Sequence, residues 1–87
     1  MELQQMRYAL AIAEEQSFTR AAERCFVVQS ALSRQIKSLE SELGLTLFAR
    51  TSRKVKVTPA GEAFLEQARL CLQAADRAKV EAAAAQG

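Results

Sequence analysis

The chain has 87 residues, of which 49% are hydrophobic and 25% are charged, so one small folded domain is expected and disorder is not. Two cysteines, no histidine and a formal net charge of +2 leave few groups for metal binding or acid–base catalysis, and we expect no cofactor and no metal in this chain. No apolar run reaches the roughly twenty residues of a membrane span and no secretory signal is visible, so we expect a cytoplasmic protein without a membrane partner.

Two helices are expected in the first 25 residues. The first spans about residues 2–15, where apolar residues recur on one face: Leu3, Met6, Ala9, Leu10 and Ala13. Ser17 is a suitable N-cap for the second helix, which spans about residues 18–25. Its small residues Ala21 and Ala22 allow two helices to cross closely, as a helix-turn-helix requires.

A third helix is predicted from Gln29 to Leu43, ending at Gly44, after an apolar turn at residues 26–28 that we expect to be buried against the first helix. Its apolar stripe consists of Leu32, Ile36, Leu39 and Leu43. The opposite face carries hydrogen-bonding residues and then basic ones: Gln29, Ser30, Ser33, Arg34 and Lys37. Amide, hydroxyl and guanidinium groups on a helix suit base edges and phosphates in the major groove of DNA.

A short hairpin is predicted next, with strands at residues 45–50 and 54–57 and residues 51–53 near the tip. Val55 and Val57 alternate with Lys54 and Lys56, which places one face inward and the other toward solvent. Residues 29–58 carry a net charge of +4, whereas residues 1–28 and 59–87 carry −1 each. The basic excess therefore lies on the third helix and the hairpin, where phosphates would be.

A last helix is predicted from Thr58 as N-cap and Pro59 as first residue to about residue 85, on the order of 40 Å long. Its apolar residues repeat with a period of about 3.5 and form a seam: Phe64, Leu65, Ala68, Cys71, Leu72, Ala75 and Ala78. We interpret residues 59–87 as a helix that pairs with a second copy. The alternative, strongest beyond Lys79, is an alanine-rich helix that frays.

Two classes of function are compatible with this pattern. The three glycines, Gly44, Gly61 and Gly87, are too far apart to form a phosphate-binding loop, and we do not expect an enzyme. Cys25 and Cys71 lie on apolar stripes and are interpreted as small buried hydrophobic residues.

Specific binding to double-stranded DNA is the leading hypothesis, and a protein-interaction module with a winged fold is the alternative. The basic hairpin favours DNA.

The segments SFTRAAE, SALSRQIKSLESELG, LFAR and VTPAGE resemble the N-terminal DNA-binding domain of LysR-type transcriptional regulators. The resemblance extends from Met1 to about Ala78. It implies a mainly helical fold: a winged helix-turn-helix of three helices and a two-stranded wing at residues 1–58, followed by a long linker helix at residues 59–87. It also implies that two linker helices pair, so that the homodimer recognises an interrupted inverted repeat.

The resemblance assigns roles to individual residues. Those matching family contacts to bases or nearby phosphates are Gln29, Ser30, Ser33 and Arg34, and those of the wing are Arg50, Arg53 and Lys54. Thr19 matches a usual phosphate contact at the start of the second helix. Full-length members of the family add an effector domain that binds a small-molecule inducer. Nothing in these 87 residues corresponds to it, so we expect this chain to be the DNA-binding part alone.

The chain departs from the family pattern around the turn. Val28 stands where Ser or Thr is usual, so the third helix lacks a side-chain N-cap, and Ser30 replaces a frequent proline. Ala9 and Cys25 are smaller than usual, whereas Phe26 is larger. We expect Phe26 to fill the volume that the two smaller residues leave.

Overall fold

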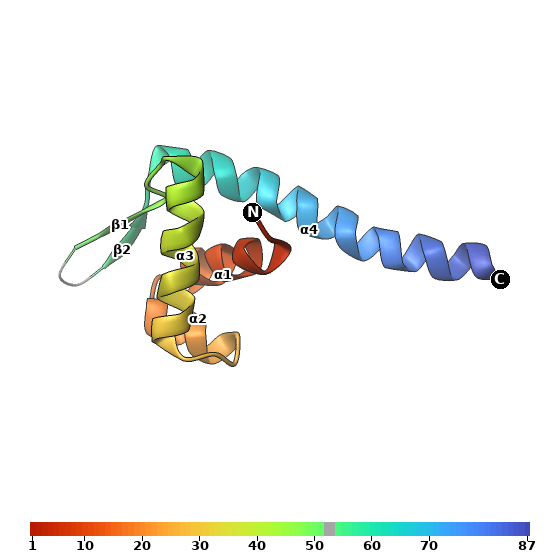
Figure 1. Ribbon diagram of the computed structural model, residues 1–87, viewed down its shortest axis with the longest axis horizontal. Helices are drawn as coiled ribbons and strands as arrows, with labels where there is room; N and C mark the ends of the chain where they lie inside the picture. The colour runs from red at the N-terminus through yellow and green to blue at the C-terminus, as the bar shows by residue number, and fades with distance from the viewer. Residues whose placement is uncertain (52–53) are drawn as a thin grey trace.

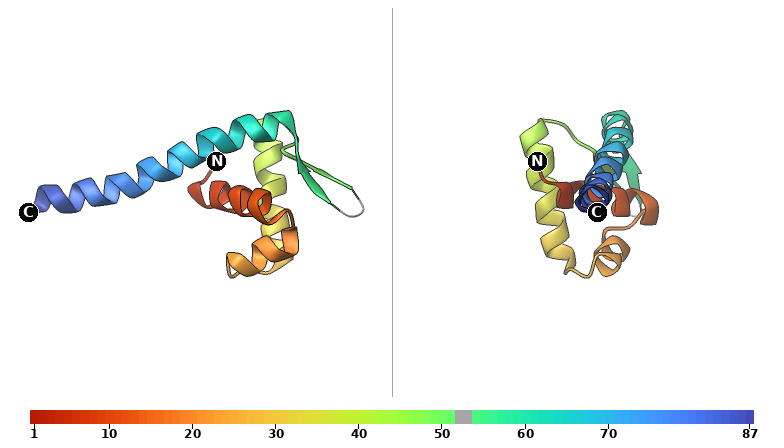
Figure 2. Two further views of the ribbon diagram at one scale, coloured as in Figure 1. Left: turned by 180° about the vertical axis from the view of Figure 1, so that it is seen from behind. Right: turned by 90° about the vertical axis from the view of Figure 1, so that its right-hand side faces the viewer.

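The computed structural model describes residues 1–51 and 54–87 (Figure 1). Its elements in chain order are α1 (Leu3–Glu15), α2 (Phe18–Arg24), α3 (Gln29–Leu43), β1 (Phe48–Arg50), β2 (Val55–Val57) and α4 (Pro59–Gln86). The first three helices form a head, from which the β1–β2 wing and the far end of α4 project in opposite directions (Figures 1 and 2). The predicted winged helix-turn-helix with a long final helix is thus confirmed. Within the described ranges, no helix is both long and apolar enough to cross a membrane.

The core of the head lies where α1, α2 and α3 meet. Leu32, Ile36 and Leu39 are fully buried, as their spacing predicts. The buried face of α1 is wider than the predicted apolar stripe and differs from it. The residues buried on this helix are Gln5, Met6, Tyr8, Ala9, Ala11 and Ile12, whereas Leu3, which was predicted to lie on the buried face, is 42% exposed. The reason is that α1 contacts α2, α3 and α4 and is therefore covered on more than one side.

The turn between α2 and α3 is exposed, and its predicted burial is wrong. Phe26 is 95% exposed and Val28 is 68% exposed, whereas Val27 packs against the core. Phe26 has a φ of 59°, and the N–H groups of Phe26 and Val27 donate to the carbonyls of Glu23 and Ala22. This left-handed helix end turns the side chain of Phe26 toward solvent. Phe26 therefore does not fill the volume that the small residues Ala9 and Cys25 leave.

The wing is shorter than predicted. β1 and β2 are antiparallel, with Phe48 opposite Val57 and Arg50 opposite Val55. Residues 45–47 do not extend β1, because the N–H of Leu47 bonds to a side chain of α3 instead of the opposite strand. This N–H donates to Oε2 of Glu40 at 2.6 Å, and the carbonyl of Leu47 accepts the N–H of Thr58 at 3.0 Å.

The first turn of α4 has the predicted N-cap. The hydroxyl of Thr58 accepts the N–H of Gly61 at 3.0 Å and donates to the carbonyl of Thr46 at 2.6 Å. A Cβ atom at Gly61 would collide with the backbone of Leu47 and the side chain of Val57. Glycine is thus required where α4 crosses the base of the wing.

The structure corrects part of the predicted dimer seam on α4. Leu65 and Ala68 are only 2% and 1% exposed, because they are buried within the chain, on the side of α4 that contacts α1. Phe64 packs against the same core, and Leu72 and Ala75 are half-buried. A helical repeat of apolar residues does not distinguish a neighbouring helix of the same chain from a second copy.

The remaining seam residues, Cys71 and Ala78, are exposed on α4. Cys71 is therefore not the buried hydrophobic residue that its position on the stripe suggested. Cys25 is half-buried and packs against the core, in agreement with its interpretation.

Replacing Val28 with serine is expected to stabilise the protein by about 0.5–1 kcal/mol. Val28 is the N-cap residue of α3, with φ −77° and ψ 147°, and its aliphatic side chain cannot accept a hydrogen bond from the first turn. Because this side chain is exposed, the substitution removes little packing. Thermal or denaturant unfolding measures the change, with Val28→Ala as the control. A Val28→Ser variant no more stable than Val28→Ala would contradict the capping argument.

Candidate nucleic-acid interface

The exposed face of α3 carries all five residues that the sequence singled out on this helix. Gln29, Ser30, Arg34 and Lys37 are exposed, and Ser33 is half-buried. Nε2 of Gln29 donates to Oγ of Ser33 at 2.9 Å, one helical turn away. This bond orients the Gln29 amide along the helix, and its oxygen and second N–H can still pair with a base. Adenine offers the matching donor and acceptor in the major groove.

The wing contributes basic side chains next to the start of α3. Arg50, Thr51 and Lys54 line a hollow of about 320 Å³ together with Gln29, and Ser17 and Phe18 from the α1–α2 corner complete its wall. The fold therefore brings the predicted wing residues Arg50 and Lys54 close to the first residue of the recognition helix. Arg53, the third predicted wing residue, lies outside the described residues.

The positive charges of this face are not neutralised by neighbouring carboxylates. Across residues 1–51 and 54–87, none of the following forms a salt bridge: Arg20, Arg34, Lys37, Arg50, Lys54 and Lys56. Arg24, on the far end of α2, contacts Glu14 at 2.6 Å and Glu15 at 3.3 Å, and the Glu14 carboxylate raises the pKa of its guanidinium above the ordinary value. The cations of α3 and the wing are available for phosphates.

Thr19 is exposed in the first turn of α2, immediately after two residues of the hollow, Ser17 and Phe18. At this position Thr19 can reach a phosphate at the edge of the candidate interface, as the resemblance implies. Helix α2 is anchored there because Oγ of Ser17 accepts the N–H of Arg20 at 3.0 Å.

Two residues that organise this surface were missed in the sequence. Glu40 was counted only as an opposing charge, yet its Oε2 accepts the N–H groups of both Leu47 and Phe48, at 2.6 and 3.2 Å. Phe18 lies under the guanidinium of Arg50, with Cζ 4.0 Å from the ring centroid. No local pattern indicates either contact, because each joins residues that only the tertiary fold brings together.

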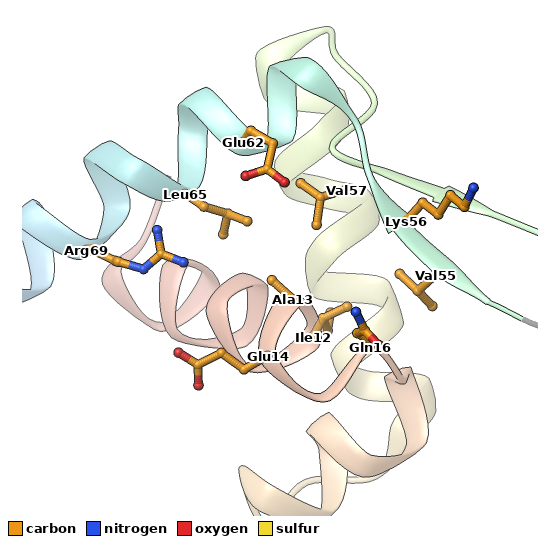
Figure 3. A pocket seen from close by; sticks show the side chains of 10 residues that line it. All are labelled: Ile12, Ala13, Glu14, Gln16, Val55, Lys56, Val57, Glu62, Leu65 and Arg69. Carbon is orange, nitrogen blue, oxygen red and sulfur yellow. The ribbon is translucent and has the colours of Figure 1, made fainter.

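A separate hollow of about 390 Å³ lies between α1, β2 and α4 (Figure 3). Apolar residues, among them Ile12 and Leu65, and polar residues contribute equally to its wall; the polar ones are Glu14, Gln16, Lys56, Glu62 and Arg69. It contains none of the residues predicted to contact DNA. The predicted contacts that the structure describes lie instead on α2, α3 and the wing.

The fold and this surface define a winged helix-turn-helix protein. Residues 3–62 match the family described as bacterial regulatory helix-turn-helix proteins of the lysR family. Since this match covers more than half of the residues, the chain belongs to the LysR family.

Solved and curated relatives agree with this assignment. The chain is 53% identical over 68 residues to the HTH-type transcriptional regulator BenM of Acinetobacter baylyi, which is 78% of this chain and 22% of BenM. It matches the crystal structure of a CbnR_DBD–DNA complex with a TM-score of 0.97 and 40% identity over the whole of both chains. It matches a BenM_DBD/benA site 1 DNA complex with a TM-score of 0.95 and 44% identity, over 100% of this chain and 98% of that one. The match covers only 22–29% of the length of BenM and of three other curated relatives, YcgK, HcaR and ClcR.

Proposed function

We propose that this chain binds double-stranded DNA sequence-specifically and without catalysis, as the DNA-binding part of a cytoplasmic LysR-type transcriptional regulator. Helix α3 enters the major groove, and the wing contacts the backbone beside it. The observation that carries the proposal is the hollow in which Gln29, at the start of the exposed polar face of α3, meets Arg50 and Lys54 of the wing, neither of which forms a salt bridge in the described ranges. The close similarity to DNA-binding domains solved with DNA supports the same assignment.

Base readout is assigned to α3. Gln29 and Arg34 project from its exposed face within two turns of its N-terminus, and Ser33 orients Gln29. Glutamine pairs in a bidentate way with adenine, and arginine does so with guanine. The wing contributes positive charge close to the helix, and its residues supply affinity for any duplex.

Arg34→Ala is expected to weaken binding to the preferred duplex by about 1–3 kcal/mol more than binding to random DNA, because a guanine contact discriminates between bases. The preferred duplex is obtained by selection from a random pool, and both affinities are measured by fluorescence anisotropy. Arg77→Ala is the control, since it removes the same charge from the distal part of α4, where Arg77 pairs with Glu81, and not from α3 or the wing.

If Arg34→Ala loses the same affinity for the preferred and the random duplex, Arg34 contacts only phosphate. A wild-type chain that selects no duplex even at low salt would overturn the DNA-binding proposal and favour a protein-interaction module.

Lys54→Ala is expected to lower affinity for preferred and random duplexes alike. It should also reduce the slope of log K against log salt concentration by up to about one unit, because one phosphate contact is lost. Lys79→Ala, in the exposed part of α4, should leave the slope unchanged. A slope that is the same in all three chains would remove Lys54 from the interface.

We propose that two copies pair through α4. Beyond Ala75 every residue of this helix is exposed, so the distal part of α4 extends past the head that could cover it. Leu70 and Val80 are exposed on α4, at 54% and 61%, but Val80 lies half a turn around the helix from Cys71. The apolar residues exposed along the predicted seam are Cys71 and Ala78. A second copy could bury these side chains, and a two-fold dimer would read an interrupted inverted repeat.

Cys71→Glu is expected to weaken the dimer roughly tenfold or more, because it places two like charges near the seam. Cys71→Ser is the control of similar size. The head should remain folded in both variants, because Cys71 is exposed in the single chain, whereas a glutamate at Ala68 would enter the core. Sedimentation measures the change. A wild-type chain that stays monomeric at high concentration would contradict the pairing.

A further inference from the structure

The aromatic ring of Phe18 makes two different contacts at the corner between α1 and α2. Its side chain is 8% exposed, and its ring packs against Phe48 in an edge-to-face arrangement, with centroids 6.1 Å apart and planes at 79°. Cζ of Arg50 lies over the same ring, 4.0 Å from its centroid. A cation within about 6 Å of a ring centroid is attracted by the negative face of the ring.

The geometry follows from the period of a strand. Side chains two residues apart in β1 project to the same side, so Phe48 and Arg50 face Phe18 together and Ala49 faces away. Phe18 is itself fixed as the first residue of α2, next to the N-cap Ser17. A side chain of the rigid core therefore determines where the guanidinium of an exposed wing residue lies.

This stack leaves the guanidinium able to bind an anion. The N–H donors of arginine lie in the plane of the group, so a ring below that plane does not block them. Within the described part of the chain, Arg50 forms no salt bridge, and it lines the hollow that also contains Gln29. A mobile arginine loses side-chain entropy when it contacts a phosphate, and a stacked one loses less.

We propose that Phe18 is a positioning residue for DNA binding: it holds the guanidinium of Arg50 beside the N-terminus of α3, where it contacts a backbone phosphate of the strand that α3 reads. The inference rests on the proposed DNA binding and adds a role for a buried residue that acts through the side chain of Arg50. It also separates Arg50 from Lys54, a wing cation that stacks on no aromatic ring among residues 1–51 and 54–87.

A double-mutant cycle on the complete 87-residue chain tests this role. Phe18→Leu keeps an apolar residue at the site but removes the ring face, and it should lower affinity for the selected duplex roughly two- to five-fold. In an Arg50→Ala background the same substitution should have no effect. Phe18→Tyr retains the ring and should restore wild-type affinity. A second cycle combines Phe18→Leu with Lys56→Ala, which removes a charge from the other strand of the wing. In this cycle the two losses of binding free energy should add.

NMR of the unbound protein separates positioning from a general loss of stability. In wild type the side-chain Hδ and Hε of Arg50 should be shifted upfield by the ring, and this shift should vanish in Phe18→Leu and persist in Phe18→Tyr. Thermal melting shows whether each variant is folded, and Phe18→Met replaces Phe18→Leu if the latter is not.

The outcomes separate the two proposals. Equal losses in the Arg50 and Arg50→Ala backgrounds, or tighter binding by Phe18→Leu, would overturn the positioning role while leaving DNA binding in place. Failure of the wild-type chain to bind any duplex would instead overturn the proposed function.

Discussion

The carboxylate of Glu40 fixes how the wing leaves the recognition helix. It lies in the C-terminal half of α3 and accepts the N–H groups of Leu47 and Phe48 with one oxygen. Hydrogen bonds to an ionised acceptor are stronger than neutral ones, and without this carboxylate two amides at the base of β1 would lose their partner. Glu40 places a negative charge on the basic segment, yet it lies three turns from Gln29, and its Oε2 is bonded to the backbone of Leu47 and Phe48.

The other end of the wing is fixed by the start of α4. The hydroxyl and N–H of Thr58 bond to the carbonyls of Thr46 and Leu47, and Gly61 allows the helix to cross this backbone closely. Both strands are thus anchored at the base. The stack of Arg50 on Phe18 adds a third connection, between the wing and the corner that precedes α2. The wing and α3 therefore form one surface of defined shape, which a rigid duplex requires of a protein that binds it.

Local signals in the sequence predicted the elements well. The end of α3 and the start of α4 follow from Gly44 and from Thr58-Pro59, because caps act within one turn. The outward direction of Phe26 could not be predicted from its apolar character, since it depends on the left-handed backbone at that residue. The burial of Ala68 within the single chain and the contacts of Glu40 depend on the tertiary fold, and neither can be predicted from composition or periodicity.

The central claim is that α3 and the wing contact the same duplex as one surface. A titration of the isotope-labelled chain with the selected duplex, followed by backbone amide NMR shifts, tests it most directly. We expect the largest changes in residues 29–37 and in both strands of the wing, with small changes at the exposed turn around Phe26. Changes confined to α3, or concentrated at the turn with none in the wing, would contradict the claim.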